Sequence, residues 1–149
     1  MLKRTVAALA AVTVLLAGGQ ALSRVWSKPP DLPVNTRDIP GFYLNHTQQA
    51  IDIIDAVGSD NLWVQYDIYH MQIMEGDLAP TMQKHLGQIA HIQLADNPGR
   101  NEPGTGEINY AFLFGFIDRL GYDGWIGCEY KPKANTVDGL GWIKPYLHA

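Results

Sequence analysis

The chain has 149 residues, 46% hydrophobic and 17% charged, and its formal net charge is −4. This length and composition fit one globular domain with an ordinary core and exclude a fibrous or disordered class. The basic residues are scattered, which argues against nucleic-acid binding, because such binding needs many contacts to phosphates. We interpret the single cysteine, Cys128, as a buried and inert thiol, which fits a reducing compartment.

The first 23 residues have two interpretations. Lys3 and Arg4 precede a small, apolar run over residues 5–17, which is the pattern of a secretory signal with a poor cleavage site near Ser23. The run is short for a membrane span. It also has helical spacing and is followed by Gly18-Gly19, so it equally fits an alanine-rich helix of an α/β enzyme. The pattern alone leaves both interpretations open.

Residues 20–33 show no clear period, and their prolines forbid a helix and weaken any strand. Beyond Val34 the pattern becomes orderly, beginning with a turn-rich loop over Asp38–Phe42. Apolar spacing and glycine stops then predict the following elements in chain order: a helix over Thr47–Val57, a strand over Leu62–Asp67, a loop over Tyr69–Gly76, a short helix from Asp77 or Pro80 to about Gly87, and a strand over Ile89–Ala95.

A long loop separates this strand from a helix that Asn109 caps and Gly121 ends. A strand over Trp125–Tyr130 follows, and Thr136 opens a last helix. Three strands thus alternate with helices at the spacing of crossover units. This order predicts a parallel sheet covered by helices.

Polar side chains stand near the carboxyl ends of the three predicted strands, where parallel sheets usually carry their chemistry. These are Asp67, Gln93 and Glu129. Two carboxylates and an amide oxygen are hard ligands, which favour Mg or Mn over Zn or Cu. The alternative is that Asp67 and Glu129 are carboxylates at loop edges, paired with lysine or arginine.

Three further features lie near these strand ends. His70 follows Asp67 by three residues and could donate a hydrogen bond to a substrate oxygen, although a structural histidine is the alternative. Arg100 could hold an anionic substrate through its planar guanidinium, or it could be a solvated arginine without a partner. The stretch Gly104-Thr105-Gly106 lacks the lysine of a phosphate-binding loop, so we expect a tight turn, which Glu107 could fix.

Several motifs in one order resemble the hydroxypyruvate isomerase family of xylose isomerase-like TIM barrels. The resemblance spans roughly Pro33 to Tyr146 and rests on the loop Asp38–Phe42 and on the segments Tyr66–Gln72, His91–Pro98, Glu102–Ile108 and Gly127–Pro132. Members of this family are complete eight-stranded barrels. The chain therefore resembles the carboxyl-terminal half of such a barrel, an α/β fold of parallel strands alternating with helices.

The resemblance implies interconversion of hydroxypyruvate and 2-hydroxy-3-oxopropanoate through a metal-stabilised enediolate. Asp67, Gln93 and Glu129 match metal-ligand positions, and Glu129 also matches one of two catalytic glutamates. His70 and Arg100 match substrate-contacting positions. The implied cofactor is a divalent metal, Mg or Mn, and the implied partner is a small anionic hydroxy-oxo acid, with no nucleic acid and no membrane.

One departure from the family concerns the other catalytic glutamate. The family ends a strand with Glu-Pro-(Val/Ile)-Asn, whereas here Leu32 precedes Pro33-Val34-Asn35. Asp31 is one residue off, so on a strand it would face the opposite side. We therefore divide the chain into a divergent segment, residues 1–32, and a half-barrel, residues 33–149, and expect an impaired enzyme.

Two other classes of function remain as alternatives. Open sheet edges could make the chain a non-catalytic fragment that pairs with another copy, as a homo-oligomer, or with a complementary half-barrel. A sugar epimerase or isomerase-like domain, exported if residues 1–23 act as a signal peptide, is the third interpretation. The match to a barrel helix in the first residues favours a cytoplasmic location.

Overall fold

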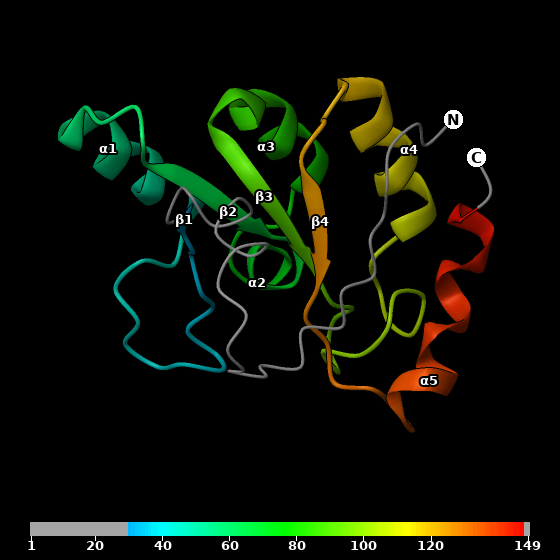
Figure 1. The fold of residues 1–149 in the computed structure, drawn as a ribbon. Helices are drawn as coiled ribbons and strands as arrows, with labels where there is room; N and C mark the ends of the chain where they lie inside the picture. Colours follow the sequence, from blue (N-terminus) through cyan, green and yellow to red (C-terminus); the bar gives the residue numbers. More distant parts are fainter. Residues whose placement is uncertain (1–29, 148–149) are drawn as a thin grey trace, which may run out of the picture.

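A parallel sheet of four strands forms the centre of the computed structural model, which describes residues 30–147 (Figure 1). The strands are ordered β1-β2-β3-β4 and span Pro30–Asp31, Trp63–Asp67, Ile89–Leu94 and Trp125–Cys128. The three predicted strands and their parallel order are confirmed. The strand β1 was not predicted, and only two of its residues pair with β2.

Helices connect the strands, as the alternating pattern predicted. They span Thr47–Val57 (α1), Ile68–Met74 (α2), Leu78–His85 (α3, followed by the 3-10 turn η2, Leu86–Gln88), Tyr110–Leu120 (α4) and Thr136–Gly139 (α5, followed by the 3-10 helix η3, Leu140–Tyr146). Gly58 and Gly121 end α1 and α4 at positive φ, and the Asn109 side chain accepts a hydrogen bond from the Phe112 amide at 3.1 Å. The predicted caps are therefore confirmed.

One predicted element was wrong. The stretch Tyr69–Gly76 was expected to be a loop, but most of it lies in α2, which Asp67 caps by accepting a hydrogen bond from the His70 amide at 3.1 Å. The first four residues of α2 are all buried, so the helix shows no apolar and polar alternation in the sequence. The predicted last helix does begin at Thr136, and after one α-helical turn it continues as the 3-10 helix η3, which contains Pro145.

The hydrophobic core lies between the helices and one face of the sheet. Because side chains alternate along a strand, Tyr66, Ile92 and Cys128 face the core, and Gln65, Asp67 and Gln93 face the other way. The core residues from the helices include Ala50, Ile54, Met82, Leu113, Phe114 and Ile117. Cys128 is a buried free thiol, as predicted, and burial raises its pKa to about 11.

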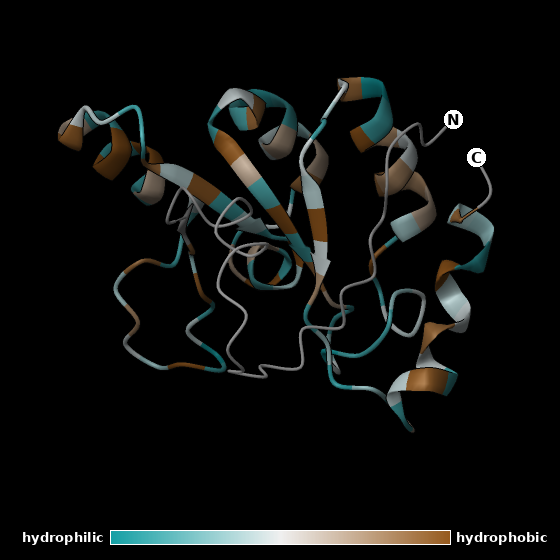
Figure 2. Ribbon diagram, in the orientation of Figure 1, coloured by the Kyte–Doolittle hydropathy of each residue, from teal (hydrophilic) through white to brown (hydrophobic). Residues whose placement is uncertain are grey.

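The segments that follow the strands lie together at one end of the sheet, the lower end in Figure 1. Hydrophilic residues predominate in the segments after β3 and β4, whereas the segment after β1 also contains hydrophobic stretches (Figure 2). Within residues 30–147, no helix has the length and apolar character needed to cross a bilayer. Residues 1–29, which carry the signal-like or helical pattern, lie outside the described part, so both interpretations of them stay open.

Candidate active site

The strand register brings the three predicted ligand residues to the same side of the sheet. Asp67 is in register with Gln93, and Gln93 with Gly127. Glu129 lies two residues beyond Gly127, and its amide donates to the Leu94 carbonyl at 3.0 Å, which continues the pairing of β4 with β3. Since residues two apart on a strand share a face, Glu129 faces the same side as Asp67 and Gln93. The amide oxygen of Gln93 accepts a hydrogen bond from the Gln65 amide nitrogen.

Asp67 is a buried carboxylate with a perturbed pKa. Its side chain is almost fully buried and accepts a hydrogen bond from the His70 amide. Burial raises the pKa of Asp67 to about 6, helped by the charge of Glu129, while the His70 amide and the Arg100 charge act in the opposite direction. A cation bound beside Asp67 would favour its ionised form.

The two ring nitrogens of His70 have different surroundings. Its Nδ1 atom lies 3.1 Å from the backbone nitrogen of Asn35, which donates to it. Burial, together with the charge of Arg100, lowers the pKa of His70 to about 4. The ring is therefore neutral near pH 7, and since Nδ1 accepts, the proton is on Nε2. His70 is thus both the structural histidine of one interpretation and a potential hydrogen-bond donor.

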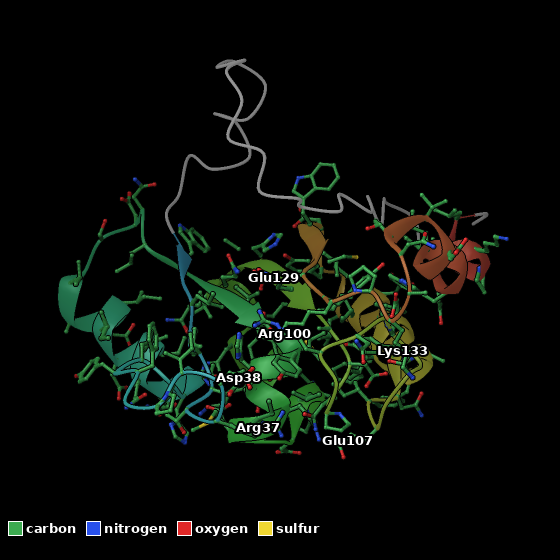
Figure 3. All side chains as sticks on the ribbon, turned by 90° about the horizontal axis from the view of Figure 1, so that it is seen from below. Arg37, Asp38, Arg100, Glu107, Glu129 and Lys133 are labelled. Atoms are coloured by element: carbon green, nitrogen blue, oxygen red, sulfur yellow. The ribbon has the colours of Figure 1, made fainter. Side chains whose placement is uncertain are left out.

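Arg100 and Glu129 form a close ion pair, with 2.6 Å between Nη2 and Oε2. The guanidinium also lies over the Tyr69 ring, 5.2 Å from its centroid. The interpretation of Arg100 as an arginine without a partner is therefore wrong. Half of the Glu129 side chain is exposed, and Figure 3 shows it next to Arg100.

The oxygen atoms at this site are ligands that suit a hard divalent cation, but only two of them come from carboxylates. Within residues 30–147, no three histidine, cysteine, aspartate or glutamate side chains gather as a metal cluster. Asp67 and Glu129 contribute two carboxylates, and the amide oxygen of Gln93 would be the third ligand. The backbone register pairs Asp31 with Val64, and Leu32 follows Asp31 in the chain. The metal ligands therefore stay a prediction.

A buried carboxylate that the sequence analysis missed, Asp96, organises the loop after β3. Its oxygens accept hydrogen bonds from the backbone amides of Gly104 at 2.8 Å, Gly106 at 2.9 Å and Ile108 at 3.1 Å. The tight turn predicted at Gly104 is present, with φ at 86°. Glu107 helps to close it, since its amide donates to the Asn97 carbonyl at 2.9 Å. The sequence signal was an aspartate between a strand and a glycine-rich loop.

The segment after β1 adds polar side chains that were interpreted only as part of a turn-rich loop. Nη2 of Arg37 donates to the Tyr69 hydroxyl at 3.3 Å and to Oδ1 of Asn97 at 2.9 Å. The Tyr69 hydroxyl in turn donates to Oδ2 of Asp38 at 2.8 Å. Nothing in the local sequence predicted these contacts, because their partners are 31 to 60 residues away.

Comparison with known proteins assigns this chain to a family. The family described as "Xylose isomerase-like TIM barrel" matches residues 28–146. The chain belongs to the xylose isomerase-like TIM-barrel family. This confirms the family resemblance and the α/β fold class.

Two curated relatives share more than half of their aligned residues with this chain. It is 58% identical over 114 residues to hydroxypyruvate isomerase from Escherichia coli strain K12, covering 76% of this chain and 44% of the relative. It is 55% identical over 115 residues to 2-oxo-tetronate isomerase from Cupriavidus necator, covering 77% of this chain and 44% of the relative. The chain thus spans a little under half the length of these relatives.

A solved structure supports the fold. The crystal structure of a family 2 AP endonuclease from Brucella melitensis superimposes with a TM-score of 0.75 and 44% identity, covering 77% of this chain and 45% of that one. The half-barrel topology, with an open sheet, is therefore that of part of a larger barrel.

Proposed function

We propose that this chain carries the carboxyl-terminal part of an isomerase active site for a small hydroxy-oxo acid, with hydroxypyruvate and 2-hydroxy-3-oxopropanoate as the interconverted pair. The observation that carries the proposal is the placement of Asp67, Gln93 and Glu129 on one side of the sheet end, beside a neutral His70. The similarity to two isomerases of related hydroxy-oxo acids supports the substrate class.

Each residue of the site has a role in a proton shift between neighbouring carbons. Glu129 removes the proton from the carbon beside the carbonyl and the proton returns on the adjacent carbon, while the hydroxyl proton passes from the hydroxyl oxygen to the former carbonyl oxygen. His70 donates from Nε2 to a substrate oxygen on which negative charge develops. Arg100 contacts the substrate and positions Glu129 through their ion pair. A bound divalent ion, Mg or Mn at Asp67, Gln93 and Glu129, would polarise the substrate oxygens.

The same chain is impaired in this reaction because the second base is missing. Leu32 stands where the family has a glutamate, and the register of Asp31 with Val64 argues against a substitute from β1. One carboxylate must then both remove and return the proton.

Turnover of hydroxypyruvate by the purified chain, followed by proton NMR with Mg or Mn present, tests this proposal. We expect slow turnover that Glu129→Gln abolishes and that Leu32→Glu raises by about a hundredfold or more, the lower end of the range for a positioned base. Leu32→Gln is the matched control and should stay at the original rate. Equal rates in the Leu32→Glu and Leu32→Gln variants would refute the missing-base explanation. No turnover in any variant would refute the isomerase assignment of this chain.

A second candidate function is non-catalytic association with another copy. It is supported by the sheet edges at β1 and β4 and by Trp125 on β4, whose side chain is 47% exposed. Exposed strand edges favour pairing with another strand. Sedimentation velocity should show a dimer that Trp125→Gln weakens, and a stable monomer at all concentrations would count against this candidate.

A further inference from the structure

Arg37 lies at the rim of the proposed site and is held there from two sides. Its side chain is 48% exposed, yet Nη2 is fixed by the Tyr69 hydroxyl and by Oδ1 of Asn97. These partners come from α2 and from the loop after β3. The guanidinium therefore has a defined position between two elements that both border the site.

The two arginines at this end of the sheet differ in how far their charge is already satisfied. Arg100 is 2.6 Å from the Glu129 carboxylate, whereas Nε of Arg37 is 3.9 Å from the nearest oxygen of Asp38. The other oxygen of Asp38 already accepts hydrogen bonds from Tyr69 and Asn35. Among the described residues, Nη1 of Arg37 has no acceptor. A guanidinium with free N–H groups is suited to a planar carboxylate.

A series of contacts links Arg37 to Glu129, the residue that would move the proton. Tyr69 connects them, since Arg37 contacts its hydroxyl and Arg100 lies over its ring. Burial tends to raise the pKa of Asp38, but the hydrogen bonds from Tyr69 and Asn35 and the charges of both arginines hold it below its usual value. Figure 3 shows Glu129, Arg100, Asp38 and Arg37 following one another across this end of the molecule.

We propose that Arg37 binds the carboxylate of the substrate and thereby selects hydroxy-oxo acids over uncharged sugars of the same length. Arg100 remains with Glu129 near the reacting carbons, and Arg37 receives the charged end of the molecule. This inference rests on the proposed function, because it assumes that the reacting carbons lie at Glu129 and His70. If its hydrogen bond to Asn97 were its whole role, Arg37 would only link two loops. The test must therefore distinguish an effect on substrate choice from an effect on the stability of the fold.

Hydroxypyruvate and dihydroxyacetone form a matched pair of probes, since they differ only in a carboxylate replaced by a hydroxymethyl group. Titration calorimetry of the purified chain, with Mg present, should show tighter binding of hydroxypyruvate. Arg37→Gln should weaken hydroxypyruvate binding by about tenfold or more, the effect of losing a charge-assisted contact. It should leave dihydroxyacetone binding unchanged, and a cooperative unfolding transition should show that the variant is folded. Arg37→Lys should retain part of the preference.

Arg119→Gln is the control for net charge, because Arg119 lies over Phe116 on α4, away from the strand ends. It should leave both affinities unchanged. An unchanged hydroxypyruvate affinity in Arg37→Gln, equal losses for both probes, or no preference in the unaltered chain would each overturn the inference. The isomerase proposal is tested separately by turnover. If the chain binds hydroxypyruvate through Arg37 but does not turn it over, the isomerase proposal is refuted and carboxylate selection by Arg37 is not.

Discussion

The two loops that border the site, residues 95–109 after β3 and residues 32–46 after β1, are held in different ways. The loop after β3 closes on a buried carboxylate, Asp96, which accepts three backbone amides from across the loop. The loop after β1 is held by a few separate contacts, chiefly the Asn35 amide on His70 and Arg37 on Asn97. It also exposes hydrophobic side chains, with Tyr43 78% exposed.

The loop after β3 therefore holds its own conformation, whereas the loop after β1 is positioned by contacts with other elements. The loop after β3 carries Arg100 at φ 54°, a conformation that its own hydrogen bonds must maintain. The loop after β1 carries Arg37 and depends on side chains of other elements for its position. We therefore expect changes in the first loop to cost stability, and changes in the second to alter pH dependence and binding.

The largest effect is expected from Asp96→Ala. One buried and two partly buried amides would lose their acceptor, and so the free energy of unfolding should fall by about 3 kcal/mol or more. Urea denaturation followed by tryptophan fluorescence measures this change. Asp60→Ala, at an exposed turn, is the matched control and should change stability by less than about 0.5 kcal/mol. A similar small change for Asp96→Ala would mean that the loop does not depend on this carboxylate.

A smaller effect, dependent on pH, is expected at the anchor of the other loop. The folded pKa of His70, about 4, lies below its usual value, so the neutral ring is favoured by folding. Its contribution to stability is complete above about pH 6.5 and is lost as the pH falls toward about 4. His70→Gln keeps an acceptor for the Asn35 amide but cannot be protonated.

The unfolding free energies of the unaltered chain and of His70→Gln, measured in metal-free buffer, should therefore differ with pH. On acidification from about pH 7 to about pH 4, the variant should gain roughly 2 kcal/mol relative to the unaltered chain. Parallel pH profiles would show that the ring does not anchor the loop as a neutral acceptor.

The smallest effect on stability is expected from Glu129→Gln. The carboxylate is half exposed, and exposed ion pairs contribute little, so unfolding should change by less than about 1 kcal/mol. The same variant should lose turnover, which separates a functional carboxylate from a structural one such as Asp96. A loss of stability as large as that of Asp96→Ala would instead assign Glu129 to the fold.

Much of the fold could be predicted because its signals are local. The helices α1 and α4 have apolar stripes and glycine stops, and β2, β3 and β4 are short apolar runs between turns. The strand β1 could not be predicted, because it is two residues long and lies among prolines. The helix α2 was missed because its exposed side is too small to produce a period.

The sequence by itself determined the parallel order of the strands and hence that Asp67, Gln93 and Glu129 face one side of the sheet end. Side chains alternate between the two faces of a strand, so the face of each residue follows from its position along the strand. Only the tertiary structure decided that Arg100 pairs with Glu129, that Asp96 holds its loop, and that Arg37 reaches Asn97. Contacts between loops depend on how the connected elements pack, and no local pattern encodes which distant side chains meet.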